Sequence, residues 1–284
     1  MNGKLYLCAT PIGNLGDVSA RCLEVFKSAD LIAAEDTRRT LQLLNHFEIS
    51  KPLTSYHEHN KHEKGGYIIS LLKNGKNVVL VSDAGTPAIS DPGEDLVRLC
   101  IENGIDVTSI PGPVAGINAL ILSGLDTKRF AFEGFLSVNK RHRKEHLESV
   151  KNDTHTLIFY EAPHKLRNTL SDMQKTFGGD RKIVLARELT KIHEEIKRCT
   201  IDEAVLYYSE NNPRGEYVLV VEGATTVADE AEHEWDALSV TEHVDKYIAE
   251  GMTQKEAIKK AAAERSVPKR DVYNEYHLTR GETQ

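Results

Sequence analysis

Three segments rich in glycine and proline each follow a short apolar run, and this arrangement restricts the fold more than any other feature of the chain. The apolar run 5–9 precedes the segment 10–17, the run 78–81 precedes the segment 82–93, and the run 107–110 precedes the segment 111–113. Short apolar runs bounded by Gly and Pro are typical of buried parallel strands. In open α/β sheets the ligand crevice lies beyond the carboxyl ends of the strands. We therefore expect a small-molecule site on these loops, where glycine permits close approach of backbone and proline fixes the loop shape.

Strand-like runs and helical patterns alternate along most of the chain, whose 284 residues suffice for two domains and an additional piece. In the first half this alternation predicts βαβ units and a parallel sheet. The expected helices span about 17–29, 37–47, 62–73 and 92–103. A second series of strand-like runs follows at 157–160, 183–186 and 217–221. The predicted fold class is α/β, with α/β domains at 1–113 and 114–225 and a ligand cleft between them.

The composition shifts from residue 225 onward. The acidic stretch 229–232 is expected to form a solvated linker, and a small helical module is expected at 233–284, with helices near 241–250, 254–264 and 268–277. Its basic residues are Lys255, Lys259, Lys260, Arg265, Lys269 and Arg270. This pattern fits a nucleic-acid-binding unit of the helix-turn-helix type. It fits a solubilising helical cap equally well, and the residues alone leave both interpretations open.

The composition indicates a soluble cytoplasmic protein. No apolar run approaches membrane-spanning length, and Met1–Lys4 leads directly into a short strand rather than into a signal peptide. The four cysteines show no CxxC pairing, so reduced thiols are expected. The histidine-rich stretch 57–62 lacks the HExxH spacing, and no metal site is expected. The net charge of −7 disfavours indiscriminate nucleic-acid binding but allows a local basic patch.

Several familiar nucleotide and hydrolase motifs match poorly. Gly13 and Gly16 give only GxxG, and Pro11 stands where a dinucleotide-binding turn needs glycine. Neither a P-loop nor a GxSxG nucleophile turn is present. What remains is a set of charged residues directly after the apolar runs: Glu35, Asp36, Arg38, Asp83, Glu161, Arg187, Glu188, Arg214 and Glu216. Some of these, such as Asp36, are expected only to cap helices.

Seven segments taken together, in this order, resemble the ribosomal RNA small subunit methyltransferase I family of the tetrapyrrole-methylase fold superfamily. They are 10–17, 34–38, 82–93, 111–113, 158–161, 186–191 and 214–216. The resemblance covers essentially the whole chain. It implies two α/β domains with S-adenosylmethionine bound in the cleft between them, a homodimer, and a cytidine ribose 2′-hydroxyl of small-subunit ribosomal RNA as methyl acceptor.

The resemblance also implies site residues. The implied cofactor-binding residues are Pro11, Ser82, Asp83, Ala84, Gly85, Pro113, Val114, Ala115, Phe159, Tyr160, Ala186 and Gly215. A ribose hydroxyl is a weak nucleophile, so a general base or a stabilising cation is expected nearby. The candidates are Glu35, Asp83, Glu161 and Glu188 as bases, and Arg38, Arg187 and Lys191 as cations. The sequence does not choose among them.

The densest basic stretch, 139–144, is the candidate surface for RNA phosphates. Its cations are Lys140, Arg141, Arg143 and Lys144. Such a contact would be salt-dependent. Two other functions stay open: methylation of a tetrapyrrole precursor on the same fold, and RNA binding without catalysis. The basic residues favour RNA over a tetrapyrrole, and the intact Gly/Pro loops favour catalysis.

Overall fold

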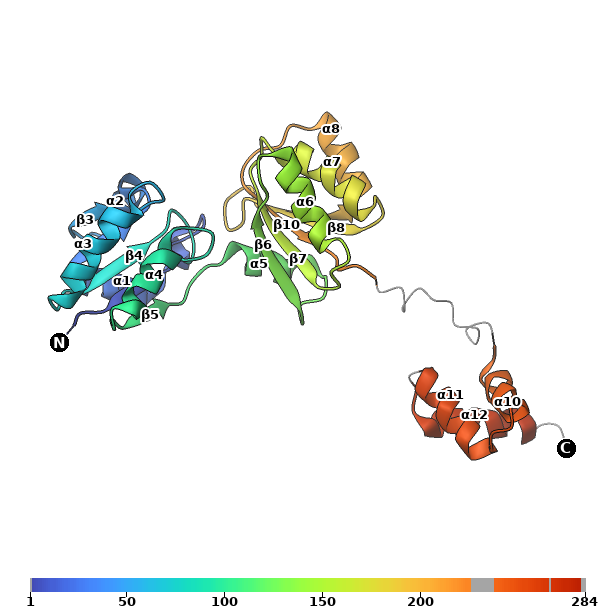
Figure 1. Cartoon of the computed structure of the whole chain (residues 1–284). Helices are drawn as coiled ribbons and strands as arrows, with labels where there is room; N and C mark the ends of the chain where they lie inside the picture. The colour runs from blue at the N-terminus through green and yellow to red at the C-terminus, as the bar shows by residue number, and fades with distance from the viewer. Residues whose placement is uncertain (1, 226–237, 266, 282–284) are drawn as a thin grey trace. The chain divides into compact units, whose positions relative to one another are not determined.

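A computed structural model describes residues 2–225, 238–265 and 267–281 (Figure 1). The chain divides into two compact units, Met1–Ala224 and Thr225–Gln284. The acidic stretch 229–232, expected to be a linker, lies outside the described residues. No helix in the described ranges is both long and apolar enough to cross a membrane.

The first sheet of the larger unit is parallel throughout, as the βαβ pattern predicts. Its strand order is β3-β2-β4-β1-β5. The strands are β1 (Leu5–Cys8), β2 (Leu31–Ala34), β3 (Leu53–Ser55), β4 (Val78–Val81) and β5 (Val107–Ile110). The central strands β2 and β4 are buried at every position, which explains their unbroken apolar runs. The sequence analysis missed β3, an edge strand of three half-buried residues.

Four α-helices and one short 3₁₀ helix connect these strands. They are η1 (Leu15–Asp17), α1 (Ala20–Ser28), α2 (Thr37–His46), α3 (Lys61–Lys73) and α4 (Gly93–Glu102). The first helix begins later than expected because Ser19 caps it, accepting a hydrogen bond from the Cys22 N–H at 3.1 Å. Apolar side chains on both faces of the sheet form two separate cores. Because both faces of the sheet are packed, its strands hold the loops at their carboxyl ends in fixed positions.

The second sheet of the larger unit is mixed, with order β6-β7-β10-β8-β9. Its strands are β6 (Phe130–Phe135), β7 (Thr156–Glu161), β8 (Lys182–Arg187), β9 (Glu195–Thr200) and β10 (Tyr217–Val221). Only β6 and β7 pair in parallel. The predicted strands are the three buried central ones. The edge strands β6 and β9 were missed because they are partly exposed and lack a continuous apolar run.

Helices cover both faces of the second sheet. They are α5 (Ala115–Ser123), α6 (Lys140–Val150), α7 (Leu166–Phe177) and α8 (Ile201–Glu210). Helices α6, α7 and α8 pack on one face, where Phe159 is buried, and α5 packs on the other with Ile158 and Val218 (Figure 1). Successive strand residues therefore point into different cores.

The described residues of the smaller unit form a bundle of three helices: α10 (Val240–Ala249), α11 (Gln254–Glu264) and α12 (Lys269–Gly281). Each lies within a few residues of its predicted range. The Thr253 capping box is also present, with the Glu256 carboxylate accepting from the Thr253 N–H at 3.1 Å. A core that includes Val244, Ile258 and Tyr276 holds the helices together.

Candidate functional site

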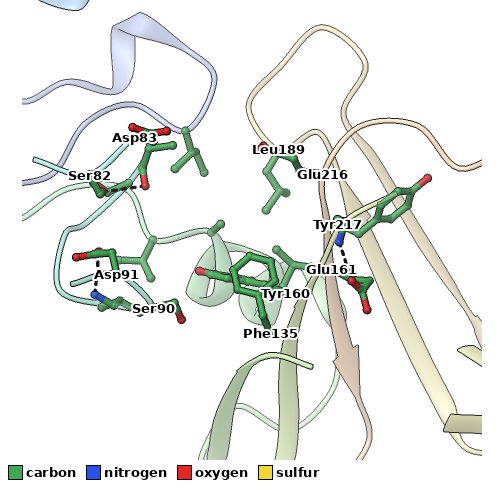
Figure 2. Close-up of a pocket in the computed structure, with 18 of the residues that line it drawn as sticks. Ser82, Asp83, Ser90, Asp91, Phe135, Tyr160, Glu161, Leu189, Glu216 and Tyr217 are labelled. Carbon is green, nitrogen blue, oxygen red and sulfur yellow. Dashed lines mark hydrogen bonds between the residues drawn. The ribbon is translucent and has the colours of Figure 1, made fainter. Parts of the chain in front are cut away.

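A cavity of about 610 Å³ is lined by loops from both sheets of the larger unit (Figure 2). The loops after β1, β2, β4 and β5 contribute Ile12, Glu35, Ser82–Thr86 with Ile89, and Val114, among others. The ends of β7, β8 and β10 contribute the facing residues Tyr160, Ala186 and Tyr217, among others. Its volume falls within the range typical of small-molecule sites. The cavity therefore lies where the three Gly/Pro segments predict a ligand site.

Backbone hydrogen bonds join the Gly/Pro loops to one another. Thr10 and Gly85 exchange reciprocal bonds of 2.9 and 3.0 Å between their backbone groups. The Thr86 hydroxyl donates to the Pro113 carbonyl at 3.0 Å. Gly85 adopts a φ of +80°, which disfavours any residue with a side chain. These bonds fix the three loops as one wall of the cavity.

The loop after β4 is held in an uncommon backbone conformation. Ala88 and Ser90 have φ values of +67° and +63°. The Asp91 carboxylate accepts three backbone N–H bonds, from Ala88 at 3.0 Å, Ile89 at 3.3 Å and Gly93 at 2.8 Å. Backbone strain of this kind persists only where surrounding contacts enforce it, and it concentrates at functional sites. Asp91 thus shapes the loop, and its oxygens are occupied.

The opposite wall is built around Glu188, which has a φ of +51°. One of its carboxylate oxygens accepts from the Lys191 ammonium and from the Glu216 N–H, each at 3.0 Å. Burial raises the pKa of Glu188, but these two donors outweigh burial and hold it below its ordinary value. A side chain at Gly215 would collide with Glu188, since its Cβ would lie 2.5 Å from that carboxylate. The wall is joined to the first loop by a 3.0 Å bond from the Asn14 N–H to the Thr190 hydroxyl.

Most residues expected to bind the cofactor lie in the lining: Ser82, Asp83, Ala84, Gly85, Val114, Ala115, Tyr160 and Ala186. Pro11, Pro113 and Gly215 belong to the surrounding loops and not to the lining. Phe159 is fully buried in the core under α6, α7 and α8. The expectation that Phe159 faces the ligand is therefore wrong, because neighbouring residues of a strand point to opposite faces.

The charged candidates separate into two groups. Glu35, Glu161 and Glu188 line the cavity, whereas Arg38 and Arg187 do not. Arg38 bends back onto Asp36, the cap of α2, with an N–O distance of 2.8 Å, and Arg187 pairs with Glu195 at 2.9 Å. Glu161 is buried, and its oxygens accept from the Ala162 N–H and the Thr169 hydroxyl. Both arginines therefore lie outside the cavity lining, and Glu161 has both of its oxygens engaged.

Glu35 differs from the other carboxylates of the lining. Its side chain is exposed to the cavity, yet the surrounding loops partly desolvate it. This desolvation, together with the nearby carboxylates of Asp83 and Asp91, raises the pKa of Glu35 above its ordinary value. The Asp83 carboxylate itself accepts from the Asp36 N–H at 2.9 Å and pairs with Arg39 at 3.3 Å. Glu35 is thus an accessible carboxylate of the lining whose pKa is raised.

The lining also contains residues that no sequence pattern singled out, among them Arg39, Phe135, His164 and Tyr217. Arg39 is adjacent to Arg38, and sequence alone does not tell which of the two bends back onto the helix cap. Phe135 ends β6, a strand without a clear sequence signal. His164 follows Pro163 after the end of β7, where a loop beyond a predicted strand offered a usable signal.

The basic stretch forms the start of helix α6, where three of its cations are exposed and one is buried. Lys140, Arg141 and Lys144 are exposed, and Arg141 pairs with Glu145 four residues later. Arg143 is buried and its guanidinium lies 2.7 Å from the Asp172 carboxylate of α7. It also donates to the carbonyls of Ser137 and Val138. The expectation that Arg143 contacts RNA is therefore wrong, because its donors already hold α6 to α7.

Replacing Arg143 with Gln is expected to lower the free energy of unfolding by about 3–5 kcal/mol, because the buried Asp172 carboxylate loses the cation that it pairs with. Urea unfolding followed by circular dichroism measures this. The matched control is Arg141→Gln in the same helix, which loses only an exposed ion pair and is expected to change stability by less than about 0.5 kcal/mol. Equal effects of the two changes would contradict a structural role for Arg143.

Within the described ranges, no group of three His, Cys, Asp or Glu side chains is placed to hold a metal ion. The cavity offers instead what an organic cofactor requires. Its lining combines small or apolar side chains such as Ala84, Ala115 and Leu189 with polar groups such as Ser82. A Cβ added to Gly85 would come within 3.3 Å of the Pro113 carbonyl and 3.2 Å of Ile12. The lack of spare room at Gly85 therefore reflects the close packing of this loop against Ile12 and Pro113, which holds the cavity wall in place.

Comparison with known proteins agrees with this geometry. Residues 4–205 match the family model of Tetrapyrrole (Corrin/Porphyrin) Methylases. The chain is 51% identical over 277 residues to Ribosomal RNA small subunit methyltransferase I of Bacillus subtilis, covering 97% of this chain and 94% of that protein. It is 52% identical to the protein of the same name from Halalkalibacterium halodurans, covering 97% and 95% of the two chains.

Solved structures share the fold at low sequence identity. Uroporphyrin-III-C-methyltransferase from Thermus thermophilus matches with a TM-score of 0.56 and 18% identity, covering 80% of this chain and 98% of that one. Diphthine synthase matches with a TM-score of 0.59 and 15% identity, covering 78% and 90%. The fold class predicted from the sequence is thereby confirmed. The chain belongs to the tetrapyrrole methylase family and, within it, to the ribosomal RNA small subunit methyltransferase I family.

Proposed function

We propose that the chain transfers a methyl group from S-adenosylmethionine, the methyl donor of its family, to the ribose 2′-oxygen of a cytidine in small-subunit ribosomal RNA. The observation that carries this proposal is the high identity, over nearly the whole chain, to proteins named for ribosomal RNA methylation. The cytidine and the 2′-oxygen come from the family resemblance. When bound, S-adenosylmethionine supplies a methyl group activated by a sulfonium.

Residues of both walls would hold the cofactor. The backbone around Gly85 and the side chains of Ala84, Ala115 and Ala186 form small or apolar surface, and Ser82 and Asp83 supply polar groups. Tyr160 closes this region, with its hydroxyl accepting from the Gly116 N–H at 3.1 Å. Fixed backbone groups suit this task because they orient a ligand without losing side-chain entropy.

We assign the general base to Glu35. An attacking ribose hydroxyl must lose its proton, and a carboxylate with a raised pKa accepts a proton more readily than an ordinary one. Both oxygens of Glu161 accept hydrogen bonds, and one oxygen of Glu188 is held by the Lys191 ammonium and the Glu216 N–H. Asp83 anchors Arg39 and the Asp36 backbone. Glu35 takes the proton at a carboxylate oxygen, and Arg39, which also lines the cavity, keeps Asp83 in place beside it.

Outside the cavity, we assign RNA contacts to Lys140 and Lys144 of α6, which are exposed. We also propose that the protein is a homodimer. The edge strand β6 and helix α5 expose Phe130, Phe132, Ile117 and Ile121, and an apolar face of this kind is typical of a subunit interface. Sedimentation velocity is expected to report twice the 31.7 kDa chain mass, and a monomer at micromolar concentration would reject this assembly.

An rRNA acceptor places the activity in the cytoplasm, in keeping with four free cysteines. The experiment that tests the acceptor incubates the purified chain and methyl-labelled S-adenosylmethionine with small ribosomal subunits or with uroporphyrinogen III. Label is expected in the subunit RNA alone, and the Glu35→Gln variant serves as the catalytic control. Label in the tetrapyrrole alone would overturn the proposal in favour of a tetrapyrrole-precursor methyltransferase. Retention of RNA without transfer of label would favour an RNA-binding protein without catalysis.

A further inference from the structure

Helix α11 of the smaller unit carries its lysines on two different sides. Ala257, Ile258 and Ala261 face the core of the bundle. Lys255 and Lys259, four residues apart, share an exposed stripe. The ammonium of Lys260 lies instead over the Tyr247 ring of α10, 4.0 Å from its centroid. The Lys255–Lys259 stripe therefore lies away from α10.

Helix α12 presents a second stripe, made of Arg270, Tyr273 and His277, whose spacings of three and four place them on one side of the helix. Val272 and Tyr276 occupy the buried side. The His277 Nε2 atom lies 3.5 Å from the amide nitrogen of Gln254, the first residue of α11. This contact brings the α12 stripe to the end of α11 that carries Lys255, so the two stripes border one surface.

The cations of this surface are available to a ligand. Lys255, Lys259 and Arg270 are exposed, and none of the three forms an ion pair with another described residue. Nearby acids are engaged elsewhere: Glu256 accepts from the Thr253 cap, and Glu264 accepts from Tyr247 and contacts His243. Neither carboxylate forms an ion pair with Lys255, Lys259 or Arg270, although each keeps its negative charge.

An exposed aromatic pair distinguishes this surface from an ordinary solvated helix face. Tyr273 is 51% exposed, although its neighbour Tyr276 is almost fully buried. The Tyr273 and His277 rings lie 4.3 Å apart between centroids, inclined at 49°. An exposed aromatic ring among unpaired cations is the combination that single-stranded nucleic acids recognise, because bases stack on the ring while phosphates meet the charges.

We propose that Lys255, Lys259, Arg270 and Tyr273 form an RNA-binding surface on the helical unit, taking single-stranded RNA by base stacking on Tyr273 and phosphate contacts to the three cations. The inference goes beyond the proposed function and rests on it only for the choice of RNA. It assigns the smaller unit a direct part in holding the acceptor, separate from the cavity of the larger unit.

The test uses the full chain with Lys255, Lys259 and Arg270 all changed to Gln. Binding to a 20-nucleotide single-stranded RNA is measured by fluorescence anisotropy over a range of salt concentrations. Each lost phosphate contact lowers the salt slope by about 0.7, so a loss of about 2 is expected for the triple variant. The matched control changes Lys27, Lys73 and Lys128 to Gln, which removes the same charge from exposed positions of the larger unit. A slope equal to that of the parent, or an equal loss in the control, would overturn the proposal.

Tyr273 provides a second and independent readout. Tyr273→Ala is expected to weaken RNA binding about tenfold, while Tyr273→Phe keeps the ring and the affinity. Equal losses in both variants would reject stacking. Loss of small-subunit binding with unchanged binding to the bare RNA would show a protein contact instead, which also overturns the proposal. Methyl transfer by the unaltered chain is measured in parallel. Its absence would refute the proposed function, whereas the salt slopes would still decide whether the helical unit binds RNA.

Discussion

Replacing Gly85 with Ile is expected to abolish measurable S-adenosylmethionine binding. Gly85 has a φ of +80°, a conformation that a β-branched residue adopts only at high cost. Its new Cβ would lie 3.2 Å from Ile12 Cγ2 and 3.3 Å from the Pro113 carbonyl oxygen. Ile12 and Pro113 would have to shift by a few tenths of an ångström, and the strained loop would be displaced against its reciprocal bonds to Thr10. Isothermal calorimetry is expected to show a loss of affinity of at least about 100-fold, equivalent to about 2.7 kcal/mol of binding free energy.

The control for Gly85 is Gly104→Ile. Gly104 also has a positive φ, +64°, but a Cβ there would meet no atom within 4 Å, and the residue is outside the cavity lining. The Gly104→Ile variant has the same kind of backbone strain but no steric effect on the site. It should therefore bind the cofactor with full affinity, although its free energy of unfolding should be somewhat lower. Unchanged affinity in the Gly85 variant would remove the loop after β4 from the site, and equal losses in the two variants would attribute the effect to strain alone.

Replacing Glu35 with Gln is expected to lower the rate of methyl transfer by about 10²–10⁴-fold, because the amide accepts no proton from the attacking hydroxyl. Cofactor affinity should change little. Glu24→Gln, an exposed position of α1 outside the lining, is the matched control and should keep the parental rate. Single-turnover kinetics with small subunits separate the chemical step from product release. A parental rate in the Glu35 variant would exclude Glu35 as the base.

The pH dependence gives a second check on Glu35. Only its ionised form accepts a proton, and desolvation together with Asp83 and Asp91 raises its pKa. The rate of the parent should therefore fall as the pH decreases through this raised pKa, at a higher pH than an ordinary glutamate would produce. The residual rate of the Glu35→Gln variant should show no such fall. An identical acid limb in both proteins would assign the titration to another group.

The buried parts of the fold were predictable from the sequence, and the partly exposed parts were not. Strands β2, β4 and β10 are buried at every position, so their apolar runs are unbroken. The edge strands β6 and β9 gave no such signal. The burial of Arg143 could have been predicted from the sequence. Arg143 and Leu147 are four residues apart, so they lie on one side of helix α6, and the apolar Leu147 indicates that this side is buried. Strand alternation could likewise have separated Phe159 from Tyr160.

Which side chains of the site pair with one another could not be predicted from the sequence. Arg38 and Arg39 are adjacent on α2, and only the fold reveals that Arg38 folds back on Asp36 while Arg39 reaches Asp83. The same holds for the four candidate bases, since a carboxylate's availability depends on donors far away in the chain. Thr169 engages Glu161 from eight residues further on, and the Glu216 N–H engages Glu188 from twenty-eight residues further on. Sequence indicated where the cavity would lie, and tertiary contacts decided which of its groups are available.

The chemical position of the added methyl group distinguishes transfer to a ribose 2′-oxygen of small-subunit ribosomal RNA from transfer to a base. Small subunits lacking the modification are incubated with the chain and S-adenosylmethionine, and the RNA is digested and examined by mass spectrometry. We expect a cytidine with its added methyl on the sugar, an alkali-resistant bond on its 3′ side, and no such product with the Glu35→Gln variant. A methyl group found only on a base would contradict this expectation.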